Sequence, residues 1–297
     1  MNRKKTGWRD PALGPPRELA LAQGRLRWFG AGEGPPIVFV HGMLVNANLW
    51  RKVVARLSPD FRCIALDLPL GSHEVPMNQD ADLSPVGVTN LIADAVEALD
   101  LHDVTLVGND TGGALCQLLV TSRPERIGRL VLTSCDYRDK FPPPPFDSSI
   151  RVLPRFEPLL PLLFAPTRVR ALRRLPFLMG GLTKRPIERR VEDSYALPVL
   201  ADRGVRADFM KMVRGVDKRL TNEAADRLGN FDRPALIAWS RDDLFFKPVD
   251  AVRLASELPN ARLEWIEDAR TFSAEDQPDR LAELIAGFVR EPAGAAA

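Results

Sequence analysis

The chain of 297 residues contains only three histidines, three cysteines and two tyrosines. Cys63, Cys116 and Cys135 each lie in an apolar run and lack the spacing of metal ligands, so we expect buried reduced thiols and no disulfide framework. The apolar runs are far shorter than the roughly 20 residues that span a bilayer. No apolar stretch follows the basic residues Met1–Lys5, so we expect no secretory signal and predict a cytoplasmic protein.

The sequence also lacks a large excess of positive or of negative charge. The 41 basic and 39 acidic residues leave a net charge of +2, which does not favour a nucleic-acid partner. The segment 108–113 lacks the dinucleotide-binding spacing and the P-loop lysine, and no metal or flavin signature is present, so we predict no cofactor and no metal. The expected partner is a small-molecule substrate, and the composition does not indicate an oligomeric state.

The charge is distributed unevenly along the chain. Residues 138–220 hold 18 Lys and Arg against 9 Asp and Glu, and many of the 26 prolines lie in this segment. Prolines prevent long strands and keep helices short. We therefore predict a helical cap at residues 138–225, inserted into a core formed by residues 1–137 and 226–297.

The core has the pattern of an α/β protein. Short apolar runs such as 36–40 and 104–107 alternate with amphipathic helical stretches, which predicts a mainly parallel sheet with helices on both faces. Residues 17–22 and 25–29 alternate around Gln23-Gly24 and predict an opening hairpin.

Asp110 lies between a predicted strand and a predicted helix and is surrounded by small residues. The pattern Gly108-Asn109-Asp110-Thr111-Gly112 is a Gly-x-nucleophile-x-Gly turn, in which strain exposes the central side chain at the carboxyl edge of the sheet. His41-Gly42-Met43 follows an earlier strand. We expect the backbone N–H groups of Met43 and Thr111 to form an anion-stabilising pair beside Asp110.

These motifs resemble the α/β-hydrolase superfamily, and the resemblance covers most of the chain outside the cap. It includes Asp67-Leu68-Pro69 and Ser240-Arg241-Asp242-Asp243, each after a predicted strand. An aspartate at the turn resembles the haloalkane dehalogenase, fluoroacetate dehalogenase and epoxide hydrolase branch, where the carboxylate attacks carbon and a histidine-activated water hydrolyses the ester. The resemblance implies that Asp110 is the nucleophile and Asp243 the acid that orients a histidine, with Asp136 as a second candidate for the acid. Asp136 is also a possible substrate contact.

The sequence departs from this branch at the histidine. Thr271 lies where the resemblance predicts the histidine, and no histidine follows residue 102. Threonine cannot accept a proton near neutral pH. Thr111 and Met43 also replace the Trp and Asn that haloalkane dehalogenases usually direct at the halide, and Leu44 replaces a proline usual in epoxide hydrolases.

Several residues are candidates to replace the missing base. His41 is expected mainly to support the loop that follows it, with a role as the base or a substrate contact as the alternatives. His73 lies in a loop at the correct edge of the sheet and is either a replacement base or a loop residue that contacts solvent or substrate. His102 is expected at the opposite edge, on the surface. Glu275 and Asp276 either activate water or belong to the first turn of a helix.

The cap supplies further candidates. Tyr195 is either a proton donor to the substrate or a packing residue. Apolar residues between Leu159 and Met179 are expected to line a largely apolar pocket. The cap arginines either attract an anionic substrate or form a solvated face: Arg168, Arg170, Arg173, Arg174, Arg185, Arg189 and Arg190.

Three hypotheses follow. In the first, Asp110 is the nucleophile of a hydrolase and forms an alkyl-enzyme ester. In the second, Asp110 is a general acid or base in an elimination, isomerisation or cyclisation, because a carboxylate transfers protons without an ester to hydrolyse. In the third, the chain binds a ligand without catalysis. The sequence favours the first, because the turn at Asp110, the loop at Met43 and Asp243 are all retained.

Overall fold

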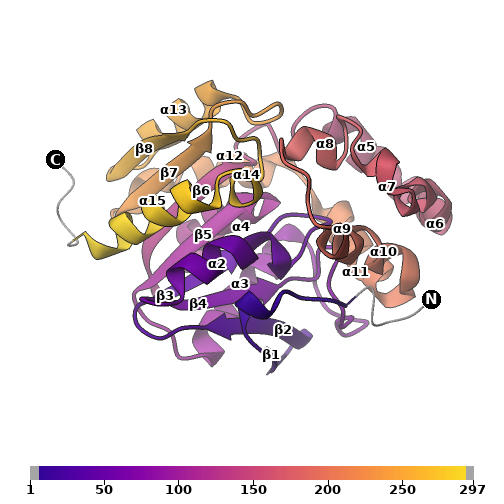
Figure 1. Ribbon diagram of the computed structural model, residues 1–297, viewed down its shortest axis with the longest axis horizontal. Helices are drawn as coiled ribbons and strands as arrows, with labels where there is room; N and C mark the ends of the chain where they lie inside the picture. Colours follow the sequence, from indigo (N-terminus) through magenta and orange to yellow (C-terminus); the bar gives the residue numbers. More distant parts are fainter. Residues whose placement is uncertain (1–6, 292–297) are drawn as a thin grey trace.

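The computed structural model describes residues 7–291 and organises them around an eight-stranded sheet (Figure 1). The strand order is β1-β2-β4-β3-β5-β6-β7-β8. The β1–β2 and β2–β4 pairs are antiparallel, and every other neighbouring pair is parallel. The strands are β1 (Pro16–Leu21), β2 (Gly24–Ala31), β3 (Pro36–Val40), β4 (Arg62–Asp67), β5 (Val104–Asp110), β6 (Ile127–Cys135), β7 (Ala235–Ser240) and β8 (Ala261–Ile266).

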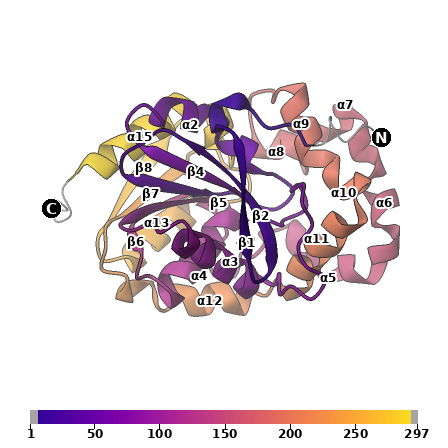
Figure 2. The ribbon, with the colours of Figure 1, turned by 90° about the horizontal axis from the view of Figure 1, so that it is seen from below.

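Helices cover both faces of this sheet, as Figures 1 and 2 show. Side chains alternate along each strand, so Leu106 packs in the cluster beneath α3, α4 and α13, whereas Val107 packs with α2 and α15. The α/β fold class predicted from the sequence is therefore confirmed. The helices are α2 (Arg51–Leu57), α3 (Pro85–Ala98), α4 (Thr111–Ser122), α13 (Pro248–Glu257), α14 (Ser273–Asp276) and α15 (Pro278–Arg290), with short 3-10 turns η1 (Pro11–Leu13), η2 (Ala47–Trp50) and η5 (Leu228–Asn230).

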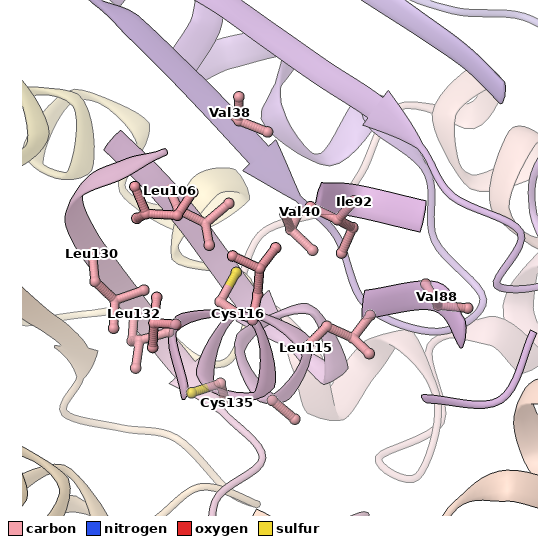
Figure 3. Close-up of a cluster of buried hydrophobic side chains, with 14 of the residues drawn as sticks. Val38, Val40, Val88, Ile92, Leu106, Leu115, Cys116, Leu130, Leu132 and Cys135 are labelled. Carbon is pink, nitrogen blue, oxygen red and sulfur yellow. The ribbon is translucent and has the colours of Figure 1, made fainter. Parts of the chain in front are cut away.

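Figure 3 shows part of the core between α4 and the central strands. Leu115 and Cys116 of α4 pack there against side chains of β3, β5 and β6, including Leu106. Cys116, Cys135 and Cys63 are buried and free, in agreement with the predicted reduced thiols. This packing fixes α4, and with it the turn that precedes the helix.

The predicted cap consists of short helices grouped beyond one end of the sheet (Figures 1 and 2). Its prolines interrupt the chain at close intervals, and within the described part of residues 138–217 no named strand forms. The elements are α5 (Phe146–Val152), η3 (Leu153–Leu159), α6 (Leu160–Leu163), η4 (Ala165–Arg168), α7 (Arg170–Arg173), α8 (Met179–Leu182), α9 (Arg189–Ala196), α10 (Pro198–Ala201) and α11 (Arg203–Gly215).

The last helix of the predicted cap segment packs against the core. Helix α12 (Lys218–Ala225) packs against α4, which belongs to the core. Its buried side chains are Thr221, Ala224 and Ala225, whereas its basic residues face outward. The basic residues on its exposed face match the composition of the cap, and the boundary of the cap at residue 225 stays a prediction.

No helix within residues 7–291 is long and apolar enough to cross a membrane. The basic residues at the start of the chain, on which the signal-peptide prediction depends, lie outside the described range.

Candidate active site

The turn at Asp110 has the strained geometry that its small residues predict. Asp110 lies between the end of β5 and the start of α4 and has φ 55° and ψ −133°. Residues other than glycine rarely adopt this backbone conformation. A Cβ atom on Gly112 would lie 2.4 Å from the carbonyl oxygen of Val40, and one on Gly108 would lie 2.7 Å from Sγ of Cys116. Only glycine fits at these two positions.

The carboxylate of Asp110 packs directly on the loop after β3. A Cβ atom on Gly42 would lie 2.2 Å from Oδ2 of Asp110. Met43 and Thr111, the predicted anion-stabilising pair, line the same cavity as Asp110. The structure therefore brings these three predicted residues together.

The cavity beside Asp110 has a volume of about 290 Å³ and lies between the cap and the carboxyl ends of β3, β5 and β7. Among the described residues that line it, only Asp110, Thr111 and Ser149 have polar side chains. Such a cavity suits a small, largely apolar molecule. Its other lining residues are Met43, Leu44, Pro142, Pro143, Phe146, Ile150, Leu153, Phe164, Phe177, Leu178, Met179, Leu182, Phe209, Phe245 and Phe246.

The sequence identified this lining only in part. Phe164 and the segment 177–179 were predicted and line the cavity, whereas Leu162 and Leu163 are 70% and 51% exposed. The tight turns of η3, α6 and η4 point these leucines outward. Phe245 and Phe246 were missed, although their position two and three residues after Asp243, in the loop that follows β7, was a signal for them.

Burial dominates the electrostatics of Asp110. It raises the pKa of this carboxyl to about 7, with a further upward contribution from Asp243 and an opposing one from the backbone N–H of Thr111. Near neutral pH, Asp110 is therefore divided between its neutral and ionised forms. This is the protonation behaviour of a group that exchanges protons.

Asp243 and Thr271 lie together as predicted, but Thr271 does not act on the cavity. Its Oγ1 donates to Oδ1 of Asp243 at 3.1 Å, and its side chain is fully buried. The same Oδ1 accepts the backbone N–H groups of Phe245 and Phe246 at 2.9 and 3.0 Å. Burial raises the pKa of Asp243, and these hydrogen bonds oppose the increase. Neither Asp243 nor Thr271 lines the cavity.

Asp136 lies behind Thr111, outside the cavity. Thr111 Oγ1 donates to Oδ2 of Asp136 at 3.0 Å, whereas Oδ1 is buried without a hydrogen-bond partner in the described structure. Burial, together with the charge of Asp110, raises the pKa of Asp136 well above its usual range. Direct contact between Asp136 and the cavity is therefore a prediction that the structure does not support, because Thr111 separates them.

None of the three histidines lines the cavity beside Asp110. Nε2 of His41 accepts the backbone N–H of Leu68 at 2.9 Å, and Nδ1 lies 2.8 Å from the carbonyl oxygen of Gly42. Burial lowers the pKa of His41 to about 4, so the ring is neutral. His41 supports its loop, as expected, and does not contact the cavity beside Asp110.

His73 and His102 are also engaged elsewhere. His73 is buried, with Nε2 3.1 Å from Oδ2 of Asp208, and it lines a different cavity. The sequence placed it correctly in a loop but did not anticipate its burial. His102 is exposed beside Asp100, as predicted.

The remaining candidates are held in structural contacts. Glu275 pairs with the buried Arg51, and Asp276 accepts backbone N–H groups of Lys184 and Arg185. Tyr195 is fully buried and lines a smaller, separate cavity. None of Glu275, Asp276 and Tyr195 lines the cavity beside Asp110, so the structure does not support a role for them as water activators or proton donors there.

Comparisons with known proteins agree with this architecture. A family model described as "alpha/beta hydrolase fold" matches residues 35–278. A protein named haloalkane dehalogenase 2 from Mycobacterium tuberculosis is 28% identical over 290 residues, which cover 93% of this chain and 96% of the relative. A 2-hydroxy-6-oxononadienedioate/2-hydroxy-6-oxononatrienedioate hydrolase from Paraburkholderia xenovorans is 25% identical over 89% of this chain and 90% of its own.

Solved structures share the fold at lower identity. A mutant of the haloalkane dehalogenase DatA from Agrobacterium tumefaciens superimposes with a TM-score of 0.77 at 19% identity, over 95% of this chain and 100% of that chain. A protein from Burkholderia ambifaria gives a TM-score of 0.77 at 21% identity, over 93% and 97% of the two chains. At these identities the likeness concerns the fold alone.

Proposed function

Because the chain belongs to the alpha/beta hydrolase fold family, we propose that it is an enzyme in which Asp110 transfers a proton of a small, largely apolar organic substrate. The carboxylate of Asp110 accepts a proton from the substrate, and the resulting carboxylic acid returns it at another atom or to a leaving group. This is the second of the three sequence hypotheses, and the reaction class is an elimination, isomerisation or cyclisation.

The environment of Asp110 carries this proposal. Its carboxyl is the ionisable side chain that lines the apolar cavity within residues 7–291, and burial raises its pKa to about 7. General acid–base catalysis is most effective when the pKa of the group lies near the working pH. Hydrolysis of an ester requires a base for water, and His41, His73 and Thr271 all lack access to this cavity.

A second candidate function is nucleophilic attack by Asp110 on a carbon atom. The strained turn and the similarity to a haloalkane dehalogenase favour it. In that case the carboxylate displaces a leaving group, such as a halide, and forms an alkyl ester. Without a base positioned to activate water, the ester would hydrolyse slowly and accumulate.

A small apolar probe tests proton transfer directly. A base removes the carbon-bound proton of 5-nitrobenzisoxazole, the N–O bond breaks, and the coloured 2-cyano-4-nitrophenolate forms. We expect the Asp110→Asn variant to lose about 100-fold or more of the rate, in the range of general base catalysis. The wild-type kcat/KM should rise with pH through about 7 and then level, because only the ionised Asp110 accepts a proton. Asp139→Asn removes an exposed carboxylate and serves as the control.

Incubation with 1-bromohexane separates the two candidate functions. Intact-protein mass spectrometry would detect one added hexyl group on the wild type, but not on Asp110→Asn, if Asp110 is a nucleophile. A hexyl adduct without benzisoxazole turnover would contradict the proton-transfer proposal and support the second candidate. Equal benzisoxazole rates for wild type and Asp110→Asn, with no adduct, would support ligand binding without catalysis.

A further inference from the structure

A second cavity, of about 400 Å³, lies between the cap and the loop after β8. Four of its lining side chains are cationic, and one is a carboxylate, that of Glu192. The remaining lining residues are apolar or small, with Thr183 as a further polar side chain. The cationic residues are Arg174, Lys184, Arg185 and Arg270.

Ion pairs already neutralise part of this charge. Lys184 lies 2.5 Å from Asp242 and 3.0 Å from Asp268, and Arg185 lies 2.8 Å from Asp268. Glu192 accepts a hydrogen bond from Nε of Arg170 at 2.6 Å. The positive charge that remains available to a ligand in this cavity therefore comes mainly from Arg174 and Arg270.

Arg174 and Arg270 form no ion pair with any carboxylate of residues 7–291. Nη1 of Arg270 donates to the carbonyl oxygen of Gly180 at 2.5 Å, but its Nε is buried without a hydrogen-bond partner. A buried donor without a partner is costly. Guanidinium groups that lack a carboxylate partner are well suited to charge-assisted hydrogen bonds with carboxylates and phosphates.

The second cavity adjoins the cavity of Asp110. Met179, on α8, lines both of them. A methionine side chain is flexible and unbranched, so a change of its rotamers can join the two spaces. A ligand that extends past Met179 would then place an apolar part beside Asp110 and an anionic part beside Arg174 and Arg270.

We infer that the second cavity is an anion subsite for the substrate of Asp110. The substrate is then an amphipathic molecule, with an apolar body for the first cavity and a carboxylate or phosphate group for the second. The inference rests on the proposed function for the apolar part alone, because the anion subsite is defined by its own residues.

Binding of a matched pair of ligands tests this inference. The probes are 4-phenylbutyrate and its uncharged counterpart 4-phenylbutanamide, measured by isothermal titration calorimetry against the full chain. We expect the acid to bind at least about tenfold more tightly than the amide, as for a charge-assisted hydrogen bond. Replacing 4-phenylbutyrate with phenylpropyl phosphate tests whether phosphate is accepted equally well.

Substitutions of the two unpaired arginines test where the anionic group of the probe binds. Arg174→Gln and Arg270→Gln should each weaken binding of the acid about tenfold and leave the amide unchanged. Arg174 makes no side-chain hydrogen bond or ion pair within residues 7–291, so its replacement removes no polar contact of the fold. Arg168→Gln changes the net charge equally at an exposed cap residue that lines neither cavity, and it should have no effect.

Two results would overturn the inference: equal affinities for acid and amide, or an equal loss of acid affinity in Arg168→Gln and Arg174→Gln. Failure here is distinguishable from failure of the proposed function. Equal affinities combined with a slow Asp110→Asn variant would reject the anion subsite alone. A preference for the acid combined with a fully active Asp110→Asn variant would reject only the proton-transfer function.

Discussion

The threonine at position 271 changes what its neighbours can do. A histidine beside Asp243 would connect that carboxylate to the cavity, whereas the Thr271 hydroxyl only donates to Asp243 Oδ1 at 3.1 Å. Asp243 then holds the backbone N–H groups of Phe245 and Phe246, two residues that line the cavity. Through these hydrogen bonds the Asp243 carboxylate anchors a loop that lines the cavity, and its role as a catalytic acid stays a prediction.

A residue-scale prediction concerns the cost of ionising Asp110. Burial raises its pKa from the usual range to about 7, so the folded state binds a proton more tightly than the unfolded state does. Stability should therefore fall as the pH rises from about 4 to about 7 and then level. Asp110→Asn removes this penalty and should raise the melting temperature at pH 8 by about 2–5 °C.

Differential scanning calorimetry at pH 4 and pH 8 provides the comparison. At pH 4 the wild-type carboxyl is already neutral in the folded state, so the variant should gain little. An equal gain at both values would show that the substitution acts by something other than the removed charge.

At the scale of elements, the loops after parallel strands bring the site together. The carboxyl ends of β3, β5 and β7 place Met43, Asp110 and Phe245 around one cavity. The sequence predicted Met43 and Asp110 because a Gly-rich turn and a His-Gly loop have recognisable spacing. It predicted only some of the cap residues that close the cavity, because the directions of side chains on 3-10 turns follow no simple period.

An element-scale prediction follows from the contact between the loop after β3 and the turn at Asp110. In Gly42→Ala the new methyl group would lie 2.2 Å from Oδ2 of Asp110, so the carboxylate must move. We expect a loss of about 100-fold in benzisoxazole turnover, similar to the removal of a positioned base. Circular dichroism should show that the fold remains.

Gly287→Ala is the matched control. Gly287 lies inside α15, and nothing lies within 4 Å of its added Cβ atom. Alanine should stabilise the protein by about 0.5–1 kcal/mol, because glycine is unfavourable in a helix interior. Turnover should be unchanged. A Gly42→Ala variant as active as this control would show that the loop yields without displacing Asp110.

At the scale of the whole molecule, a buried ion pair connects parts of the chain that are far apart in sequence. Arg51, at the start of α2, pairs with Glu275 of α14, and both side chains are at most 2% exposed. Lys52 also lies 2.9 Å from Glu275. The sequence suggested either a water-activating role for Glu275 or a place in a helical turn. It gave no sign of the partner, because Arg51 and Glu275 lie 224 positions apart in the sequence.

The last prediction separates these two roles for Glu275. Glu275→Gln leaves Arg51 buried with only the more distant carboxylates of Asp10 and Glu188 at 3.9 and 3.8 Å. Loss of one partner of a buried pair is strongly destabilising, and we expect a decrease of about 2–3 kcal/mol in the free energy of unfolding, measured by urea denaturation. Glu283→Gln, on the exposed side of α15, should change stability by less than about 0.5 kcal/mol. Benzisoxazole turnover per folded molecule should remain unchanged in both variants, because Glu275 does not line the cavity. A Glu275→Gln variant of normal stability that loses turnover would instead make Glu275 part of the catalytic machinery. That role would require contacts that connect α14 to Asp110, which this arrangement does not contain.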